Sequence, residues 1–209
     1  MGEELVMREF KPEHVPQLPK DIKPWPNWAQ SMPIDLEIGA GAGLHAIRYA
    51  LKNPERFLIA LEKTSKAERL IRRLHNHPQI GNLLAQRCDA INWVTHQAPP
   101  QSLSRIFLLY PNPYPKVSQQ NSRWPFMPFM GFLLSRLKPA GELTLATNEN
   151  FYFEQAQQQM TTHWGMKIKT VELLNSPTPP RTHFEKKYLA RGESCWNLVL
   201  TKPLSQDET

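Results

Sequence analysis

The sequence predicts an α/β fold with a mostly parallel, doubly wound sheet, and three observations support this. Short apolar runs typical of buried strands recur along the 209-residue chain. Helical patterns alternate with the early runs, as they do in parallel sheets. A glycine-rich turn follows the first run, where such a sheet places a ligand-binding loop. The last two runs show no helix between them, so we expect a C-terminal antiparallel hairpin.

The expected elements follow one another in a regular order. The first strand leads into the glycine turn, the second helix is strongly basic, and the third helix is apolar and ends before a Lys-Pro-Ala-Gly sequence that stops helices. We expect strands at residues 34–38, 57–61, 83–86, 106–109, 142–147, 166–171 and 196–201. We expect helices at residues 45–52, 66–76 and 126–137.

An extended arm is expected ahead of the first strand. Residues 10–33 contain six prolines together with Trp25 and Trp28, a composition that rules out a regular helix. The tryptophans could dock on the domain as a functional cover or simply anchor the arm.

Composition narrows the class of protein. The hydrophobic content of 40% suits one domain with a sizeable core, and the net charge of +6 suggests a polyanionic partner. Cys88 and Cys195 lie far apart and outside any Cys/His cluster, so we expect free buried thiols and no metal site. The chain has no apolar stretch of about 20 residues, and Glu3, Glu4 and Glu9 argue against a signal peptide. We therefore expect a cytoplasmic protein.

The glycine turn has the spacing E-x-G-x-G-x-G, formed by Glu37, Gly39, Gly41 and Gly43. Glycines allow a tight turn and a close approach of the backbone to a ligand. A dinucleotide fingerprint would need glycine where Leu44 stands, so a nicotinamide site is disfavoured. The spacing resembles motif I of S-adenosylmethionine-dependent methyltransferases. In that arrangement Glu37 would face the methionine end of the cofactor.

Two further acidic residues follow the next strands. Glu62 ends the second strand and could accept hydrogen bonds from the two ribose hydroxyls of the cofactor. Asp89, next to Ala90, follows the third strand and could bind the adenine amino group. Carboxylates are suitable partners for a cofactor that carries a sulfonium and an ammonium group.

A proline-rich hexapeptide, Pro111-Asn112-Pro113-Tyr114-Pro115-Lys116, follows the fourth strand. Three prolines cannot continue a strand, because proline lacks the amide donor and fixes its φ angle. The stiffened backbone therefore presents Asn112, Tyr114 and Lys116 beyond a strand end, where ligands of α/β sheets bind.

Together these motifs resemble the bacterial tRNA (guanine-N7-)-methyltransferase family over about residues 34–200. The glycine turn, Glu62, Asp89-Ala90, the hexapeptide, Thr147-Asn148 and Arg181-Thr182-His183-Phe184-Glu185 occur in the family's order. The resemblance implies a Rossmann-like fold that binds S-adenosylmethionine and acts on tRNA or another structured RNA. Its implied cofactor-binding residues are Glu37, Gly39, Gly41, Gly43, Glu62, Asp89, Ala90 and Asn112, and Asn112 is also the catalytic position. Its implied substrate-binding residues are Lys116, Asn148, Thr182, His183, Phe184 and Glu185.

The chain departs from the family on the target side and is similar to a divergent member. Asn112 and Asn148 stand where the family has aspartate, Tyr114 where it has tryptophan, and His183 where it has lysine. Methylation of guanine N7 removes no proton and needs no general base, so an aspartate there would orient the base and stabilise positive charge. Asparagine keeps the acceptor, loses the charge and adds an amide donor.

Two alternatives stay open beside an active tRNA (guanine-N7-)-methyltransferase. One is a catalytically weak or inactive paralogue that binds RNA or cofactor. The other is a methyltransferase acting on another nucleophile such as an exocyclic amine, because Asn112-Pro113-Tyr114 partly resembles the N-P-P-Y motif of amino-group methyltransferases. We expect an arm at residues 1–33, a methyltransferase domain at 34–202 and a polar tail at 203–209, in a monomer or homodimer without a membrane partner.

Overall fold

The computed structural model describes residues 9–29, 31–175 and 179–204, and within them the chain forms a seven-stranded sheet. The strand order is β3-β2-β1-β4-β5-β7-β6. Strands β1 to β5 pair in parallel, whereas β7 runs antiparallel to both β5 and β6. The strands are β1 (Ile34–Ile38), β2 (Phe57–Glu62), β3 (Leu83–Arg87), β4 (Leu103–Leu109), β5 (Leu137–Thr147), β6 (Lys167–Leu174) and β7 (Cys195–Thr201). The predicted mostly parallel sheet with antiparallel closing strands is confirmed.

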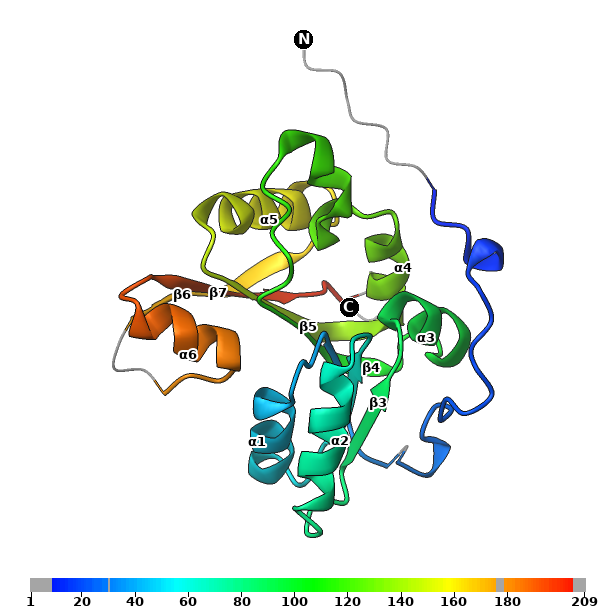
Figure 1. Cartoon of the computed structure of the whole chain (residues 1–209). Helices are drawn as coiled ribbons and strands as arrows, with labels where there is room; N and C mark the ends of the chain where they lie inside the picture. The colour runs from blue at the N-terminus through cyan, green and yellow to red at the C-terminus, as the bar shows by residue number, and fades with distance from the viewer. Residues whose placement is uncertain (1–8, 30, 176–178, 205–209) are drawn as a thin grey trace.

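Helices cover both faces of the sheet. They are α1 (Leu44–Lys52), α2 (Lys66–His75), α3 (Ala90–Gln97), α4 (Phe129–Arg136), α5 (Asn150–Thr162) and α6 (His183–Ala190). Helices α1, α2 and α6 lie on one face, and α3, α4 and α5 lie on the other (Figure 1). No helix in the described part of the chain combines the length and apolar character needed to span a membrane.

Alternation along the strands divides the core into two clusters. In β4, Ile106 and Leu108 point into the cluster under α3, α4 and α5, while Phe107 and Leu109 point into the cluster under α1, α2 and α6. Successive side chains of a strand point to opposite faces, so one apolar run supplies both layers. This double burial explains why the central strands read as continuous apolar sequence.

The connection between the last two strands differs from the expectation. The antiparallel pairing of β6 with β7 is confirmed, but the expectation that no helix separates them is wrong, because α6 lies between them. Its start is fixed by Thr182, whose side chain accepts a hydrogen bond from the backbone N–H of Glu185. Helices α3 and α5 were not expected from the sequence. Helix α4 is shorter than the expected helix at 126–137, because it begins only at Phe129 and β5 already begins at Leu137.

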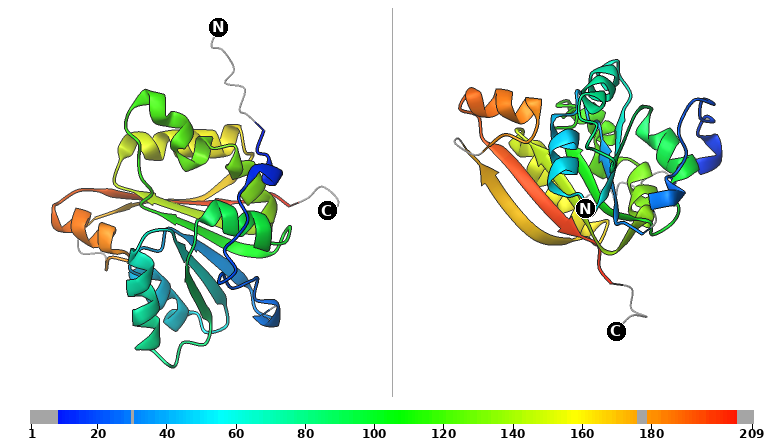
Figure 2. Two further views of the ribbon diagram at one scale, coloured as in Figure 1. Left: turned by 45° about the vertical axis from the view of Figure 1, so that its right-hand side comes forward. Right: turned by 90° about the horizontal axis from the view of Figure 1, so that it is seen from below.

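The proline-rich arm packs along α3 and α4 (Figure 2). Trp25 is buried and its ring centroid lies 6.0 Å from that of Trp93, and the ring of Phe10 contacts Phe129. Trp28 is 72% exposed. The arm is therefore held on the domain by Trp25 and Phe10. Residues 1–8 of the arm and 205–209 of the expected polar tail lie outside the described residues.

Candidate functional site

The glycine turn between β1 and α1 has three residues with positive φ angles, namely Gly39 (78°), Gly41 (56°) and Gly43 (81°). A Cβ atom added at Gly43 would lie 2.2 Å from Cδ1 of Leu70, so this glycine is required for packing against α2. A Cβ atom at Gly39 or Gly41 would meet nothing within 4 Å. The positive φ angles favour glycine at both positions, and the space beside them is open to a ligand.

Glu37 lies on β1 just before this turn and is buried. Its Oε2 lies 3.0 Å from Nδ1 of His45, which the first turn of α1 contributes. Both side chains line a cavity of about 230 Å³ that Gly39 and Gly41 also line. A carboxylate is thus held at the wall of this cavity, where it can bind a cationic group.

Glu62 ends β2 and holds the glycine turn in place. Its Oε2 accepts a hydrogen bond from the backbone N–H of Gly41 (2.9 Å), and its Oε1 accepts from the backbone N–H (2.8 Å) and the hydroxyl (2.7 Å) of Thr64. A carboxylate has about four acceptor positions. One acceptor position of Glu62 therefore stays open on Oε2, and rotation of the Thr64 hydroxyl frees a second position on Oε1. Two open acceptor positions suit the two hydroxyls of a vicinal diol.

Asp89 follows β3 and caps α3, because its Oδ1 accepts a hydrogen bond from the backbone N–H of Ile91 at 2.8 Å. It lines a second, wider cavity of about 830 Å³, whose opposite wall includes Phe10 and Val15 of the arm. Ala90 is buried at the first position of α3. Asp89 therefore faces a space between the arm and the start of α3.

These residues fit S-adenosylmethionine. Carboxylates lie at or just beyond the ends of β1, β2 and β3, in an order that matches the ammonium, the ribose diol and the adenine amine of the cofactor. The open side of the glycine turn leaves room for the ligand to contact the backbone. The same edge of a parallel sheet is where ligands of such folds bind.

The proline-rich hexapeptide forms an irregular segment after β4. Tyr110, just before it, and Tyr114, within it, have positive φ angles of 54° and 46°, which is a strained conformation for tyrosine. Asn112 is exposed, and its Oδ1 accepts a hydrogen bond from the backbone N–H of Tyr114 at 3.3 Å. Lys116 is exposed as well. The side chain of Asn112 thus uses its Oδ1 acceptor within the loop, which leaves Nδ2 as its donor for a ligand.

Arg123 holds this segment, a role that the sequence analysis missed. The guanidinium is buried and donates hydrogen bonds to the backbone carbonyls of Pro113 (3.2 Å), Tyr114 (2.8 Å) and Lys116 (3.2 Å), and also to the side chain of Gln155. The available signal was a single basic residue in an otherwise uncharged stretch after Lys116. Prolines stiffen the loop, but Arg123 fixes its position on the domain.

Asn148 follows β5 and is held by two carboxylates. Its Nδ2 donates to Oε2 of Glu193 at 3.0 Å and to Oε1 of Glu149 at 3.4 Å. Both carboxylates raise the pKa of the neighbouring Tyr188, after burial, which is the largest cause. The amide orientation leaves Oδ1 of Asn148 as the acceptor available to a ligand. Glu193 is a second residue that the sequence analysis did not identify.

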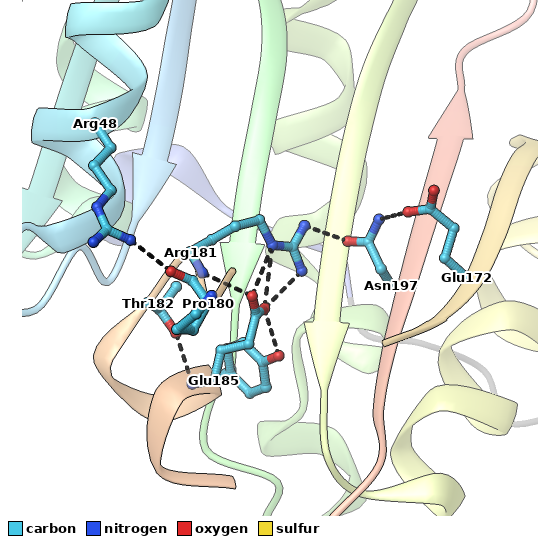
Figure 3. A network of polar contacts seen from close by, with 8 residues as sticks. Arg48, Glu172, Pro180, Arg181, Thr182, Glu185 and Asn197 are labelled. Carbon is cyan, nitrogen blue, oxygen red and sulfur yellow. Dashed lines mark hydrogen bonds and ion pairs between the residues drawn. The ribbon is translucent and has the colours of Figure 1, made fainter. Parts of the chain in front are cut away.

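The segment Arg181–Glu185 forms a network of polar contacts (Figure 3). Glu185 is fully buried, and its carboxylate accepts hydrogen bonds from Arg181 Nη2 (2.8 Å), the Arg181 backbone N–H (2.8 Å) and the Tyr110 hydroxyl (2.6 Å). Burial alone would raise the pKa of Glu185, but the hydrogen bonds from Arg181 and Tyr110 lower it below its ordinary value. In this conformation Glu185 bonds within the protein and ties α6 to the end of β4.

The three residues between Arg181 and Glu185 line the cavity of about 230 Å³ described above. Thr182, His183 and Phe184 line it together with Glu37, Gly39 and Gly41. The structure thus places three of the expected substrate-binding residues in a cavity that expected cofactor-binding residues also line. Asn112, Lys116 and Asn148 line neither of the two cavities described above.

Comparisons with known proteins agree with this architecture. Residues 31–198 match the model of a family described as "Putative methyltransferase". Three relatives carry the name tRNA (guanine-N(7)-)-methyltransferase. The protein of Burkholderia ambifaria is 27% identical over 96% of this chain and 80% of its own length. Those of Neisseria meningitidis (28% identical) and Nitrosospira multiformis (27% identical) each align with 84% of this chain and with 74% and 77% of their own lengths.

Solved structures share the fold at low sequence identity. The 16S rRNA methyltransferase KamB superposes with a TM-score of 0.63 at 18% identity, over 90% of this chain and 98% of that one. An antibiotic-related methyltransferase superposes with a TM-score of 0.60 at 17% identity, over 82% of this chain and 88% of that one.

Proposed function

Because this chain belongs to the methyltransferase family that its residues 31–198 match, we propose that its substrate is tRNA and that it methylates guanine at N7. The chain is an S-adenosylmethionine-dependent methyltransferase. The observation that carries the proposal is the open glycine turn flanked by Glu37, Glu62 and Asp89, in a chain similar along nearly its whole length to tRNA (guanine-N(7)-)-methyltransferases.

Each group on the cofactor side has a distinct task in this proposal. Glu37 binds the ammonium group, Glu62 accepts hydrogen bonds from the ribose, and Asp89 with Ala90 binds the adenine. Gly39 and Gly41 allow the backbone to approach the ligand, and Gly43 fixes the turn against α2. When bound, S-adenosylmethionine supplies a methyl group activated by its positively charged sulfur.

The target side needs no general base, because guanine N7 uses a free lone pair and loses no proton. Neutral amides at Asn112 and Asn148 are compatible with such a reaction. In the proposal Asn112 contacts the reacting base through Nδ2, Asn148 accepts a hydrogen bond through Oδ1, and Lys116 contacts the RNA. Thr182, His183 and Phe184 position the nucleotide beside Glu37. Glu185 acts through Tyr110, which precedes the loop that carries Asn112.

Loss of charge at two positions has a cost. Removing one preorganised group that stabilises charge in a transition state slows a reaction about a hundredfold. A catalytically inactive paralogue that binds cofactor or RNA is therefore the second candidate, and Asn112 with Asn148 is the observation that favours it. A cytoplasmic location and a monomeric or homodimeric state belong to the proposal as well.

Methyl transfer to total tRNA tests the proposal. Purified protein is incubated with S-adenosylmethionine carrying an isotopically labelled methyl group, and the tRNA is digested to nucleosides for mass spectrometry. We expect label in 7-methylguanosine, and none with Glu62→Ala as the matched control. Label in a methylated adenosine or another nucleoside would replace the proposed target. Absence of label, with S-adenosylhomocysteine still bound in calorimetry, would favour the inactive paralogue.

A further inference from the structure

One face of α2 concentrates positive charge beside the glycine turn. Lys66, Arg69 and Arg73 are spaced three and four residues apart, so their side chains share one face of the helix. All three line the cavity of about 230 Å³ that Thr182 and His183 of the opposite wall also line. The cavity therefore lies between a basic helix face and the start of α6.

These cations have neutral neighbours in place of acidic ones. Arg73 Nη1 donates to the carbonyl of Ala42 (2.7 Å) and lies 2.9 Å from Nε2 of His183. The Nζ atom of Lys66 lies 5.4 Å from the centre of the Phe184 ring. Among the ion pairs of the described residues, none involves Lys66, Arg69 or Arg73.

Two acidic groups nearby have partners other than the cations of α2. Glu68 on α2 pairs with Arg87 at 3.2 Å, and Glu37 in the cavity wall pairs with His45 at 3.0 Å. The pKa of His183 is lowered, first by burial and then by Arg73, Lys186, Arg48 and Arg69, so the field at its ring is positive. Cationic side chains gathered around a cavity attract an anion.

We propose that this cation-lined cavity binds a backbone phosphate of the RNA substrate. The inference rests on the proposed function, because RNA supplies the phosphodiester. Arginine guanidinium groups and a protonated or neutral imidazole are suited to phosphate oxygens, and phosphate contacts fix the register of a nucleic acid without reading its sequence. A phosphate held here lies in the same cavity as Glu37, so the adjoining nucleotide is placed next to the cofactor.

The carboxylate of the cofactor is the other anion that this cavity could hold. It is one group with one negative charge, whereas the basic face also includes Lys66 and Arg69, both exposed to solvent. A polyanion that extends out of the cavity engages these outer cations as well. The two sources are separated by measuring RNA and cofactor affinity on the same variants.

Charge reversal on α2 tests the inference. Lys66→Glu, Arg69→Glu and their combination are compared with Lys167→Glu, which makes the same change on exposed β6 at the far end of the sheet from α2. Binding of a fluorescein-labelled tRNA transcript is measured by anisotropy at several salt concentrations, and binding of S-adenosylhomocysteine by calorimetry. Arg69→Gln serves as a milder variant if Arg69→Glu lowers the melting temperature.

We expect the double variant to bind tRNA at least tenfold more weakly than Lys167→Glu. The slope of log affinity against log salt should fall by about 1 for each phosphate that the variant no longer neutralises. S-adenosylhomocysteine affinity should stay within twofold of the wild type. The inference is overturned if tRNA affinity falls no further than in Lys167→Glu, if the cofactor affinity falls in its place, or if the wild type binds no tRNA. Methyl incorporation into tRNA is measured separately. If tRNA binding depends on Arg69 but no 7-methylguanosine forms, the proposed reaction is rejected and the phosphate site is retained.

Discussion

The cofactor side and the target side of the sheet edge hold their polar groups in different ways. At the ends of β1 and β3, the carboxylates of Glu37 and Asp89 line cavities. At the end of β2, the carboxylate of Glu62 holds the glycine turn and retains acceptor capacity for a ligand. On the target side, the carboxylate of Glu185 is consumed by internal hydrogen bonds, and Asn148 offers a neutral amide. In our proposal carboxylates bind the cofactor, whereas oriented hydrogen-bonding groups and the cations of α2 bind the target.

The network of Glu185, Arg181 and Tyr110 should respond most strongly to substitution. Glu185→Gln removes the buried charge that pairs with partly buried Arg181, and breaking a buried pair from one side costs about 3 kcal/mol. We expect this loss in the free energy of unfolding, measured by urea denaturation at pH 7. Glu68→Gln is the control, because it breaks an exposed pair with Arg87. Equal stability of the two variants would show that the Glu185 network is not a structural frame.

This effect should depend on pH. The pKa of Glu185 is lower in the folded protein than its ordinary value, so its stabilising contribution is complete above the unfolded-state pKa. The contribution is lost as pH falls through the lowered folded-state pKa. The difference in unfolding free energy between the wild type and Glu185→Gln should therefore shrink as the pH is lowered below the pKa of an ordinary glutamate.

Restoring a charge at the reactive loop gives the second largest effect. In Asn112→Asp the carboxylate keeps its hydrogen bond from the backbone N–H of Tyr114 and brings negative charge toward the reacting base. We expect up to about a hundredfold faster methylation of guanine, since one preorganised charge contributes that much. Single-turnover rates on tRNA check this, with Asn121→Asp, in the exposed segment that follows the loop, as the control. An unchanged rate would mean that charge at this position does not limit the reaction.

Asn148→Asp should behave in the opposite way. The new carboxylate would face Glu193 and Glu149, which now accept hydrogen bonds from the amide. We expect a loss of about 1 kcal/mol in stability at pH 8, because like charges repel at this range. Combining it with Glu193→Gln should recover most of the loss in thermal denaturation. A stable Asn148→Asp variant without that second change would argue against the hydrogen bonds assigned to Asn148.

Much of the cofactor side could be predicted from sequence, for a physical reason. Parallel strands end at one edge of a sheet, so acidic residues that follow successive strands meet there once the strands are located. Glu37, Glu62 and Asp89 lie at or just beyond three such strand ends, although Glu37 and Asp89 line different cavities. The apolar runs located the strands because their residues are buried on both faces.

The target side depends on contacts that sequence does not reveal. Arg123 supports the loop from ten residues away, and Glu193 reaches Asn148 from 45 residues away. Helix α6 was not predicted because Thr182 and Glu185 were interpreted only as ligand contacts. Thr182 also caps this helix. In α5, the buried positions Tyr152, Ala156 and Met160 recur every fourth residue, but the aromatic residues on either side of Tyr152, Phe151 and Phe153, obscured the pattern.

Calorimetric titration with S-adenosylhomocysteine tests the division between the two sides most directly. Wild type, Glu62→Ala and Asn148→Ala are compared at one pH after their melting temperatures are confirmed. We predict that the wild type binds one equivalent, that Glu62→Ala binds at least tenfold more weakly, and that Asn148→Ala binds within twofold of the wild type. Failure of the wild type to bind, or an equal loss in Asn148→Ala, would contradict the assignment of cofactor recognition to the carboxylate-bearing strand ends.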